Sequence, residues 1–313
     1  MSTIEVQSPG LLTTVQDLGR EGFGPLGVSA SGPADAVSLR LGNRLTGNSE
    51  GAAGLEMTLL GGTFLFPQGA TIALTGSDFG ATLDGVPLQL WKAMEVTPGQ
   101  TLRVGSTRSG ARCYLCVHGG IAAKPFLGSA STHLLSGLGG HRGRALRKGD
   151  VLTIGPHTAS LGKCAVAPEA LELLSPRKTL RVTPGPQSEL FPDAAQQLFY
   201  RTAYRVAEES NRMGLRLEGP RLPHGPSGEM ITEGVSMGAV QITAAGLPII
   251  LFVEQQTTGG YAKIANVISA DLHSLGQLRP RDEIRFERVD WDAARTLLLA
   301  QEQLLTSPDL FVL

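Results

Sequence analysis

The sequence has few cysteines, few aromatic residues and almost no net charge. Its 313 residues include three cysteines and 5% aromatic side chains, and the formal net charge is −1. Such a chain has no positive field to gather nucleic acid, and the basic stretch HRGRALRK at 141–148 is typical of a solvated loop. The longest apolar run, LPIILFV at 247–253, is far shorter than a membrane span. The opening MSTIEVQSPG shows no signal peptide, so we expect a cytoplasmic protein.

Metal and thiol chemistry find little support. Cys113 and Cys116 form a C-x-x-C pattern inside ARCYLCVHGG, but this segment is typical of a strand, and an offset of three places the two thiols on opposite faces. No second Cys/His pair stands at ligand spacing. The histidines are scattered, at positions 118, 133, 141, 157, 224 and 273. We therefore expect structural cysteines and no metal site.

The common catalytic motifs are also missing. There is no phosphate loop and no H-E-x-x-H, and GLGGHRGR places Arg142 where a dinucleotide fingerprint needs its third glycine. GVSASG places Ser31 where a nucleophile elbow needs its second glycine. The chain therefore either contributes part of a site or binds something.

Turn residues and short apolar runs dominate instead. The chain has 40 glycines and 19 prolines, and a polar turn followed by alternating apolar residues recurs in TPGQTLRVG, RKGDVLTIG and RPRDEIRFE. These patterns predict a mainly β protein with two barrel-like domains joined near 162–178. Peripheral helices are predicted at 31–48, with Ser31 as its cap and Pro33 in its first turn, and at 191–204 and 290–305. A short turn capped by Ser269 is predicted in SADLHSLGQL.

Glycine- and hydroxyl-rich loops are the remaining candidates for a site. They occupy 13–20, 29–35, 118–121, 128–132, 210–217, 233–241 and 256–263. Exposed amides and hydroxyls in such loops can bind carboxylate, amide or phosphate oxygens, although any one loop can equally be a plain turn.

Taken together, these loops resemble the biotin-dependent carboxyltransferase-like family, also called the allophanate hydrolase subunit 2 or KipA family. The resemblance rests on TTVQDLGR, SGPAD, VHGGI, LGSAST, SNRMGLRL, EGVSMGAVQ and QTTGGYAKIANVISADL. It spans residues 10–287 and implies two cyclophilin-like β-barrel domains, at 1–165 and 172–290, followed by a C-terminal helix and tail at 291–313.

The resemblance also implies a set of site residues. Candidates for acid–base catalysis are Asp17, Glu254 and Asp271. Candidates for substrate or ligand binding are Gln16, Arg20, Asn211, Arg212, Glu233, Gln241, Thr257, Thr258, Gly259, Gly260, Tyr261 and Lys263. In TTGGY, the threonine hydroxyls and glycine amides would face the ligand and Lys263 would balance negative charge. The family more often has Asp at the position of Glu254, and Arg281 replaces the glycine of a common Pro-Gly-Asp turn.

Three functions follow as expectations. The chain would be the C subunit of a 5-oxoprolinase, in which it works with a KipI-like B subunit, and with an A subunit, to open the lactam of 5-oxo-L-proline to L-glutamate. ATP with Mg would act at the level of the complex, and little activity is expected from this chain alone. The alternatives are a carboxyltransferase half of a urea-carboxylase-like, biotin-dependent enzyme, and a non-catalytic KipA-type antagonist of a kinase inhibitor.

Overall fold

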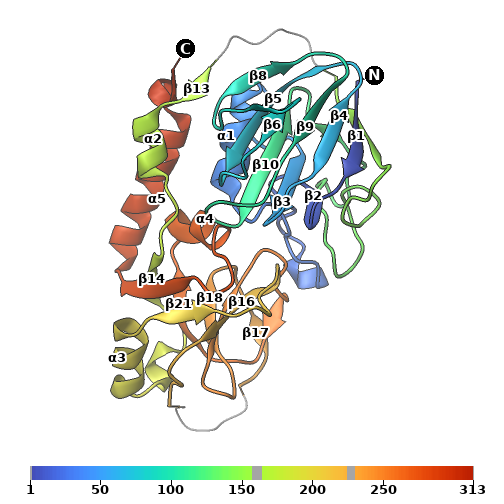
Figure 1. The fold of residues 1–313 in the computed structure, drawn as a ribbon. Coiled ribbons are helices and arrows are strands. Elements are labelled where there is room, and N and C mark those ends of the chain that lie inside the picture. Colours follow the sequence, from blue (N-terminus) through green and yellow to red (C-terminus); the bar gives the residue numbers. More distant parts are fainter. Residues whose placement is uncertain (1, 157–163, 224–229, 313) are drawn as a thin grey trace. The chain divides into compact units, whose positions relative to one another are not determined.

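The computed structural model describes residues 2–156, 164–223 and 230–312, and it is mainly β, which confirms the predicted fold class (Figure 1). The chain forms two compact units. The N-terminal unit takes residues up to Arg20, Ser31–Leu174 and the chain from Leu305, and the C-terminal unit takes Glu21–Ala30 and Ser175–Leu304. The predicted domain limits at 165 and 172 stay a prediction, because a compact unit need not fold alone. His157 and His224 lie outside the described residues.

The N-terminal unit contains two antiparallel sheets (Figure 1). One has the strand order β11-β12-β1-β4-β9-β6-β7, formed by Ile121–Ala122, Val151–Ile154, Thr3–Ser8, Thr63–Phe66, Gln100–Arg103, Thr82–Leu83 and Val86–Pro87. The other has the order β2-β3-β10-β5-β8, formed by Leu12–Gln16, Gly54–Thr58, Arg112–Val117, Ala70–Gly76 and Ala93–Val96. A small pair joins β13 (Ala165–Val166) to β23 (Phe311–Val312).

One apolar core lies between the two sheets. Ile4 and Phe64 come from the seven-stranded sheet, and Leu55 and Leu115 come from the five-stranded sheet; all four are fully buried. The alternation that the sequence shows in TPGQTLRVG and RKGDVLTIG places Leu102 and Leu152 in this core. Both sheets therefore bury one shared set of inward-facing side chains.

The two cysteines of the C-x-x-C pattern lie on opposite faces of β10, as predicted. Cys113 belongs to the core between the sheets, whereas Cys116 packs with Leu39 of helix α1 (Ala36–Leu45). Burial raises the pKa of both thiols above the usual range, which keeps them protonated and unreactive.

Helix α1 begins later than the sequence predicted. Its N-cap is Asp35, whose carboxylate accepts hydrogen bonds from the Ser38 amide at 2.9 Å and the Ser38 hydroxyl at 2.6 Å. The prediction that Ser31 caps this helix is therefore wrong. Ser31 has a φ of 55°, and Pro33 lies before the first turn, so the chain reaches helical geometry only after Asp35.

The turn before β12 is held by one carboxylate. Both oxygens of Asp150 accept from Arg144 at 2.8 Å, and Asp150 also accepts from the Arg147 amide at 2.7 Å. These donors, with the Arg144 side chain the largest cause, hold the pKa of Asp150 well below its usual range.

Asp150→Asn is therefore expected to lower the free energy of unfolding at pH 7 by about 1.5–3 kcal/mol. Because the folded pKa of Asp150 is depressed, its stabilisation is present above the unfolded pKa near 4 and is lost as the pH falls below it. Urea denaturation at pH 7 and pH 3 measures the effect, and the difference between variant and wild type should shrink at pH 3. An equal difference at both values would contradict this assignment.

The C-terminal unit contains a closed barrel with the strand order β14-β21-β18-β19-β16-β15-β22 (Figure 1). Its strands are Thr179–Pro184, Lys263–Val267, Ala239–Ile242, Pro248–Leu251, Gly214–Glu218, Tyr204–Val206 and Glu283–Arg288. The pair of β14 and β22 is parallel and the others are antiparallel. The turn before β22 places Arg281 at a φ of 72°, the left-handed conformation that the glycine of the family turn would suit.

Helices and short turns complete both units. The predicted helices are confirmed as α3 (Asp193–Arg201), where Phe199 stacks on Phe286 of β22 at 4.4 Å between ring centroids, and as α5 (Trp291–Thr306). SADLHSLGQL forms η3 (Ser269–Asp271) and α4 (Leu272–Leu275), but no side-chain cap from Ser269 holds them. The described part of the predicted connection contains a helix the sequence analysis missed, α2 (Pro168–Leu173).

The remaining short elements are η1 (Gly24–Leu26), η2 (Ser188–Leu190), η4 (Pro308–Leu310) and the ribbon of β17 (Glu233–Gly234) and β20 (Thr258–Gly259). Across the described parts of the chain, every helix is too short or too polar to cross a bilayer.

Candidate functional site

The outer wall of the barrel carries the candidate site. In β16, β19 and β18, the row Leu215, Ile250 and Val240 is fully buried, so it faces the barrel interior. The next row, Arg216, Ile249 and Gln241, must point the opposite way because successive side chains alternate across a strand. A guanidinium and a carboxamide therefore stand on the same outer face, two strands apart.

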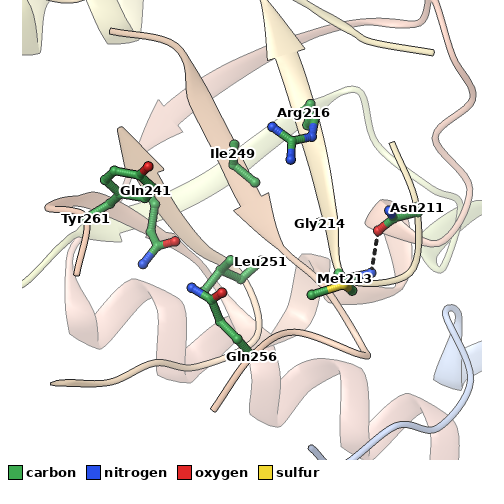
Figure 2. A pocket seen from close by; sticks show the side chains of 9 residues that line it. All are labelled: Asn211, Met213, Gly214, Arg216, Gln241, Ile249, Leu251, Gln256 and Tyr261. Atoms are coloured by element: carbon green, nitrogen blue, oxygen red, sulfur yellow. Dashed lines mark hydrogen bonds between the residues drawn. The ribbon is translucent and has the colours of Figure 1, made fainter. Parts of the chain in front are cut away.

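A pocket of about 180 Å³ lies on this face (Figure 2). Its walls are Asn211, Met213, Gly214, Arg216, Gln241, Ile249, Leu251, Gln256 and Tyr261. None of these nine residues is acidic and Arg216 is the one charged residue among them, so the lining favours an anionic ligand. This volume is smaller than that of drug-sized sites, so the pocket suits a small metabolite.

Two loops are tied together beside the pocket. The Glu254 amide donates to the Arg212 carbonyl at 2.8 Å, and the Phe252 amide donates to the Met213 carbonyl at 3.0 Å. The Arg212 guanidinium pairs with the Glu254 carboxylate at 2.5 Å, and both side chains are at least 95% buried. The side-chain oxygen of Asn211 accepts a hydrogen bond from the backbone amide of Met213 and so stabilises the turn in this loop (Figure 2). The ion pair thus fixes the loops that supply Asn211, Met213 and Gln256 to the pocket.

The two glycines of TTGGY have different surroundings. Gly259 belongs to β20 and pairs with Glu233 of β17; a Cβ on it would stand 2.5 Å from Nε2 of Gln241 and 3.0 Å from Nε2 of Gln256. Gly260 is exposed, and a Cβ there would meet its nearest neighbours at ordinary contact distances of 3.5 and 3.6 Å. The two carboxamides of the pocket therefore lie directly against Gly259.

The predicted charge of Lys263 is directed at a protein group. Its ammonium, which is buried, pairs with Glu233 at 2.6 Å, and Gln187 donates to the same carboxylate at 2.6 Å. The hydrogen bond from Lys263 is the main cause that lowers the pKa of Glu233. The pair anchors the β17–β20 ribbon to the barrel strand β21.

Of the predicted residues that line the pocket, Gln241 has a buried polar atom that makes no hydrogen bond to the described residues. It is 2% exposed, and among the described residues its Nε2 has no hydrogen-bond partner. A buried amide donor without a partner costs about 1–3 kcal/mol. Such a group is explained if a ligand supplies the missing acceptor.

The other predicted residues of this unit lie outside the pocket. Asp271 is fully buried and accepts hydrogen bonds from the backbone amide and the guanidinium of Arg181 on β14. Thr258 is exposed and Thr257 is half-buried. None of these three lines the pocket, and their proposed roles stay predictions.

The three candidates of the N-terminal unit surround the loop at 126–132. Asp17 accepts from the Ser129 and Ser131 hydroxyls at 2.5 and 2.6 Å and from the Ala130 amide at 2.5 Å. Gln16 is buried and donates to the Thr132 carbonyl, and Arg20 is buried with its guanidinium over the Phe126 ring. These contacts tie TTVQDLGR to LGSAST inside one unit, and the catalytic role of Asp17 stays a prediction.

The structure thus brings Asn211, Gln241 and Tyr261 together in one pocket, with Gly259 against its amides. Six lining residues were not among the individual candidates, although the first four lie in the candidate loops at 210–217 and 256–263: Met213, Gly214, Arg216, Gln256, Ile249 and Leu251. A sequence signal was present in part, because apolar and charged residues alternate in LRLE, which indicates that Arg216 faces away from the core. What the sequence could not supply was the register that aligns Arg216 with Ile249 and Ile249 with Gln241.

Fold and motifs together define the class of this protein. Residues 26–288 match the family model of the carboxyltransferase domain, subdomain A and B, and the chain belongs to that family.

Relatives fall in two groups. The chain is 37% identical to the 5-oxoprolinase C subunit of Haemophilus influenzae, over 91% of this chain and 90% of that protein, and 36% identical to the 5-oxoprolinase C subunit of Escherichia coli, over 93% of each. It also resembles the crystal structure of the Kluyveromyces lactis urea amidolyase, with a TM-score of 0.90 and 31% identity over 99% of this chain but 21% of that one.

Proposed function

We propose that this chain is the C subunit of an ATP-dependent 5-oxoprolinase. The observation that carries the proposal is the length of the match: the two 5-oxoprolinase C subunits are covered over 90% and 93% of their own length. The chain corresponds to a protein of that kind over nearly its full length, whereas it spans about a fifth of the urea amidolyase.

The proposed reaction converts 5-oxo-L-proline, ATP and two waters to L-glutamate, ADP and phosphate. A lactam carbonyl is a weak electrophile, and transfer of the γ-phosphoryl group of ATP to its oxygen would make the carbonyl carbon easier to attack. One water would then add to that carbon and the C–N bond would break, which opens the ring to an acyl phosphate with a free amine. The second water would hydrolyse the acyl phosphate to the carboxylate of L-glutamate and phosphate. The residues of this chain would bind and orient the lactam and donate hydrogen bonds to its oxygen.

Neither the sequence motifs nor the pocket on the barrel wall fit the nucleotide itself. The sequence has no phosphate loop, and no group of three His, Cys, Asp or Glu residues in the described chain could hold a metal ion. At about 180 Å³ the pocket is also below the roughly 300–1,000 Å³ of drug-sized sites. ATP with Mg is therefore proposed to bind in the complex through the A and B subunits.

Reconstitution tests the proposal. The chain is co-expressed with homologues of the B and A subunits, and ATP-dependent release of glutamate from 5-oxo-L-proline is measured. We expect turnover by the three together and almost none by this chain alone. Absence of turnover with correctly assembled partners would overturn the proposal.

A second candidate is a carboxyltransferase half that receives a carboxyl group from a biotinylated partner. It is favoured by the TM-score of 0.90 to the urea amidolyase structure. The same purified chain, mixed with urea and a carrier whose biotin is already carboxylated, would then transfer the carboxyl group to urea and would give no glutamate from 5-oxo-L-proline.

A further inference from the structure

We infer that the pocket on the outer barrel wall is the site that selects a cyclic amide bearing a carboxylate, with Gln241 reading the amide and Arg216 the carboxylate. This inference rests on the proposed function and assigns the residues that give it its substrate class. Its evidence is the geometry of the C-terminal unit alone.

The amide of a lactam differs in geometry from the amide of an open chain. In a five-membered lactam the N–H and C=O are held on the same side of the bond, whereas in an ordinary chain amide they point apart. A glutamine side chain carries a donor and an acceptor side by side and can therefore pair with both groups of a lactam at once. The buried Nε2 of Gln241 has no protein partner among the described residues, so this donor is available.

A second amide reinforces the first. The position of a Cβ on Gly259 is 2.5 Å from Nε2 of Gln241 and 3.0 Å from Nε2 of Gln256, so the two nitrogens are no farther apart than the sum of these distances. Figure 2 shows both side chains on the same side of the pocket, next to Leu251. Two amide donors this close can share one carbonyl oxygen, which would become more negative as the lactam is activated.

Arg216 is the candidate partner for a carboxylate. Arg216 stands in the same outward row as Gln241, with Ile249 between them. Strands are about 4.8 Å apart, so the two Cα atoms are separated by roughly 10 Å. When both side chains extend toward the pocket, the space between their polar ends matches the width of one small ring that carries a carboxylate on one side and a carbonyl on the other. Glu218, the acidic residue two positions along the same face, pairs with Arg205 at 2.7 Å.

Apolar side chains form one side of the pocket. Met213, Ile249 and Leu251 give the pocket an apolar side that suits the methylene groups of a saturated ring. A guanidinium pairs with a carboxylate through two parallel hydrogen bonds, which fixes the orientation of the ring as well as its charge. The site therefore has a distinct partner for each part of an oxo-proline-like molecule.

The test uses the reconstituted complex of all three proteins and three variants of this chain: R216M, Q241M and the control R285M. Arg285 lies on β22, is exposed and does not line the pocket. We expect R216M to raise KM for 5-oxo-L-proline about 10- to 100-fold, with a smaller change in kcat, because a charge-assisted pair to the substrate is lost. Q241M is expected to raise KM about 10-fold, and R285M should match the wild type.

A second ligand separates the two roles. 2-Pyrrolidinone has the lactam but no carboxylate, so its inhibition constant should be the same for R216M and the wild type and should rise for Q241M. Thermal unfolding of each variant chain shows whether it folds, and Q241M should melt no lower than the wild type, since it removes a buried donor that has no partner among the described residues.

The outcomes distinguish the two proposals. If the wild-type complex turns over 5-oxo-L-proline while R216M and Q241M keep its KM, the pocket assignment is wrong and the proposed function stands. If the wild-type complex has no such activity, the proposed function fails and this inference fails with it.

Discussion

Glu254→Gln is expected to lower the free energy of unfolding by about 3–5 kcal/mol, because it removes the carboxylate that faces a buried guanidinium. Arg212 and Glu254 are 5% and 3% exposed at their side chains, and their nitrogen and oxygen are 2.5 Å apart. The neutral amide keeps the shape of the side chain but leaves the charge of Arg212 without this counter-ion. Urea denaturation of the purified chain measures the loss.

Two further variants make this test decisive. Glu218→Gln removes one partner of the exposed Arg205–Glu218 pair and should cost no more than about 1 kcal/mol. Glu254→Asp keeps the charge and should recover part of the stability that Glu254→Gln loses. The resemblance suggested an acid–base role for Glu254, whereas the geometry favours a residue that positions the pocket loops. A Glu254→Gln variant as stable as the wild type but inactive in the complex would support the acid–base role instead.

Gly259→Ala is expected to raise KM for 5-oxo-L-proline in the complex by more than 10-fold, with a loss of stability of only about 1 kcal/mol, at the low end for an added methyl group. The new methyl group would stand 2.5 Å from Nε2 of Gln241 and 3.0 Å from Nε2 of Gln256. Both atoms are the far ends of flexible side chains, so they can move aside at low cost in stability. Their displacement, however, disturbs the two amides that the pocket directs at its ligand.

Gly260→Ala is the matched control. Gly260 is exposed, and a Cβ added there would stand at least 3.5 Å from every atom outside the adjacent residues. Kinetics of the two variants side by side should show a wild-type KM for Gly260→Ala and a raised KM for Gly259→Ala. A wild-type KM for both variants would show that TTGGY acts only as a turn between strands.

The sequence by itself determined the class of fold and the family. Short apolar runs separated by glycine and proline predicted a mainly β chain, and the spacing of Cys113 and Cys116 predicted that the two thiols lie on opposite faces of a strand. These features are local, because the alternation of a strand and the geometry of a turn depend on neighbouring residues. The loops that carried the family resemblance include Asn211, Gln241 and Tyr261, and all three line the pocket.

Only the tertiary structure decided which residues share the site. Arg216 reads in the sequence as an ordinary outward residue of an alternating strand, and it stands in line with Gln241 only because the barrel register aligns β16, β19 and β18. Likewise, the partners of two predicted carboxylates, Arg212 for Glu254 and Arg181 for Asp271, lie 42 and 90 positions away along the chain. Burial and pairing of charges depend on such distant contacts. A sequence motif can therefore identify these carboxylates as candidates, but it cannot distinguish a catalytic group from a group that holds a loop in place.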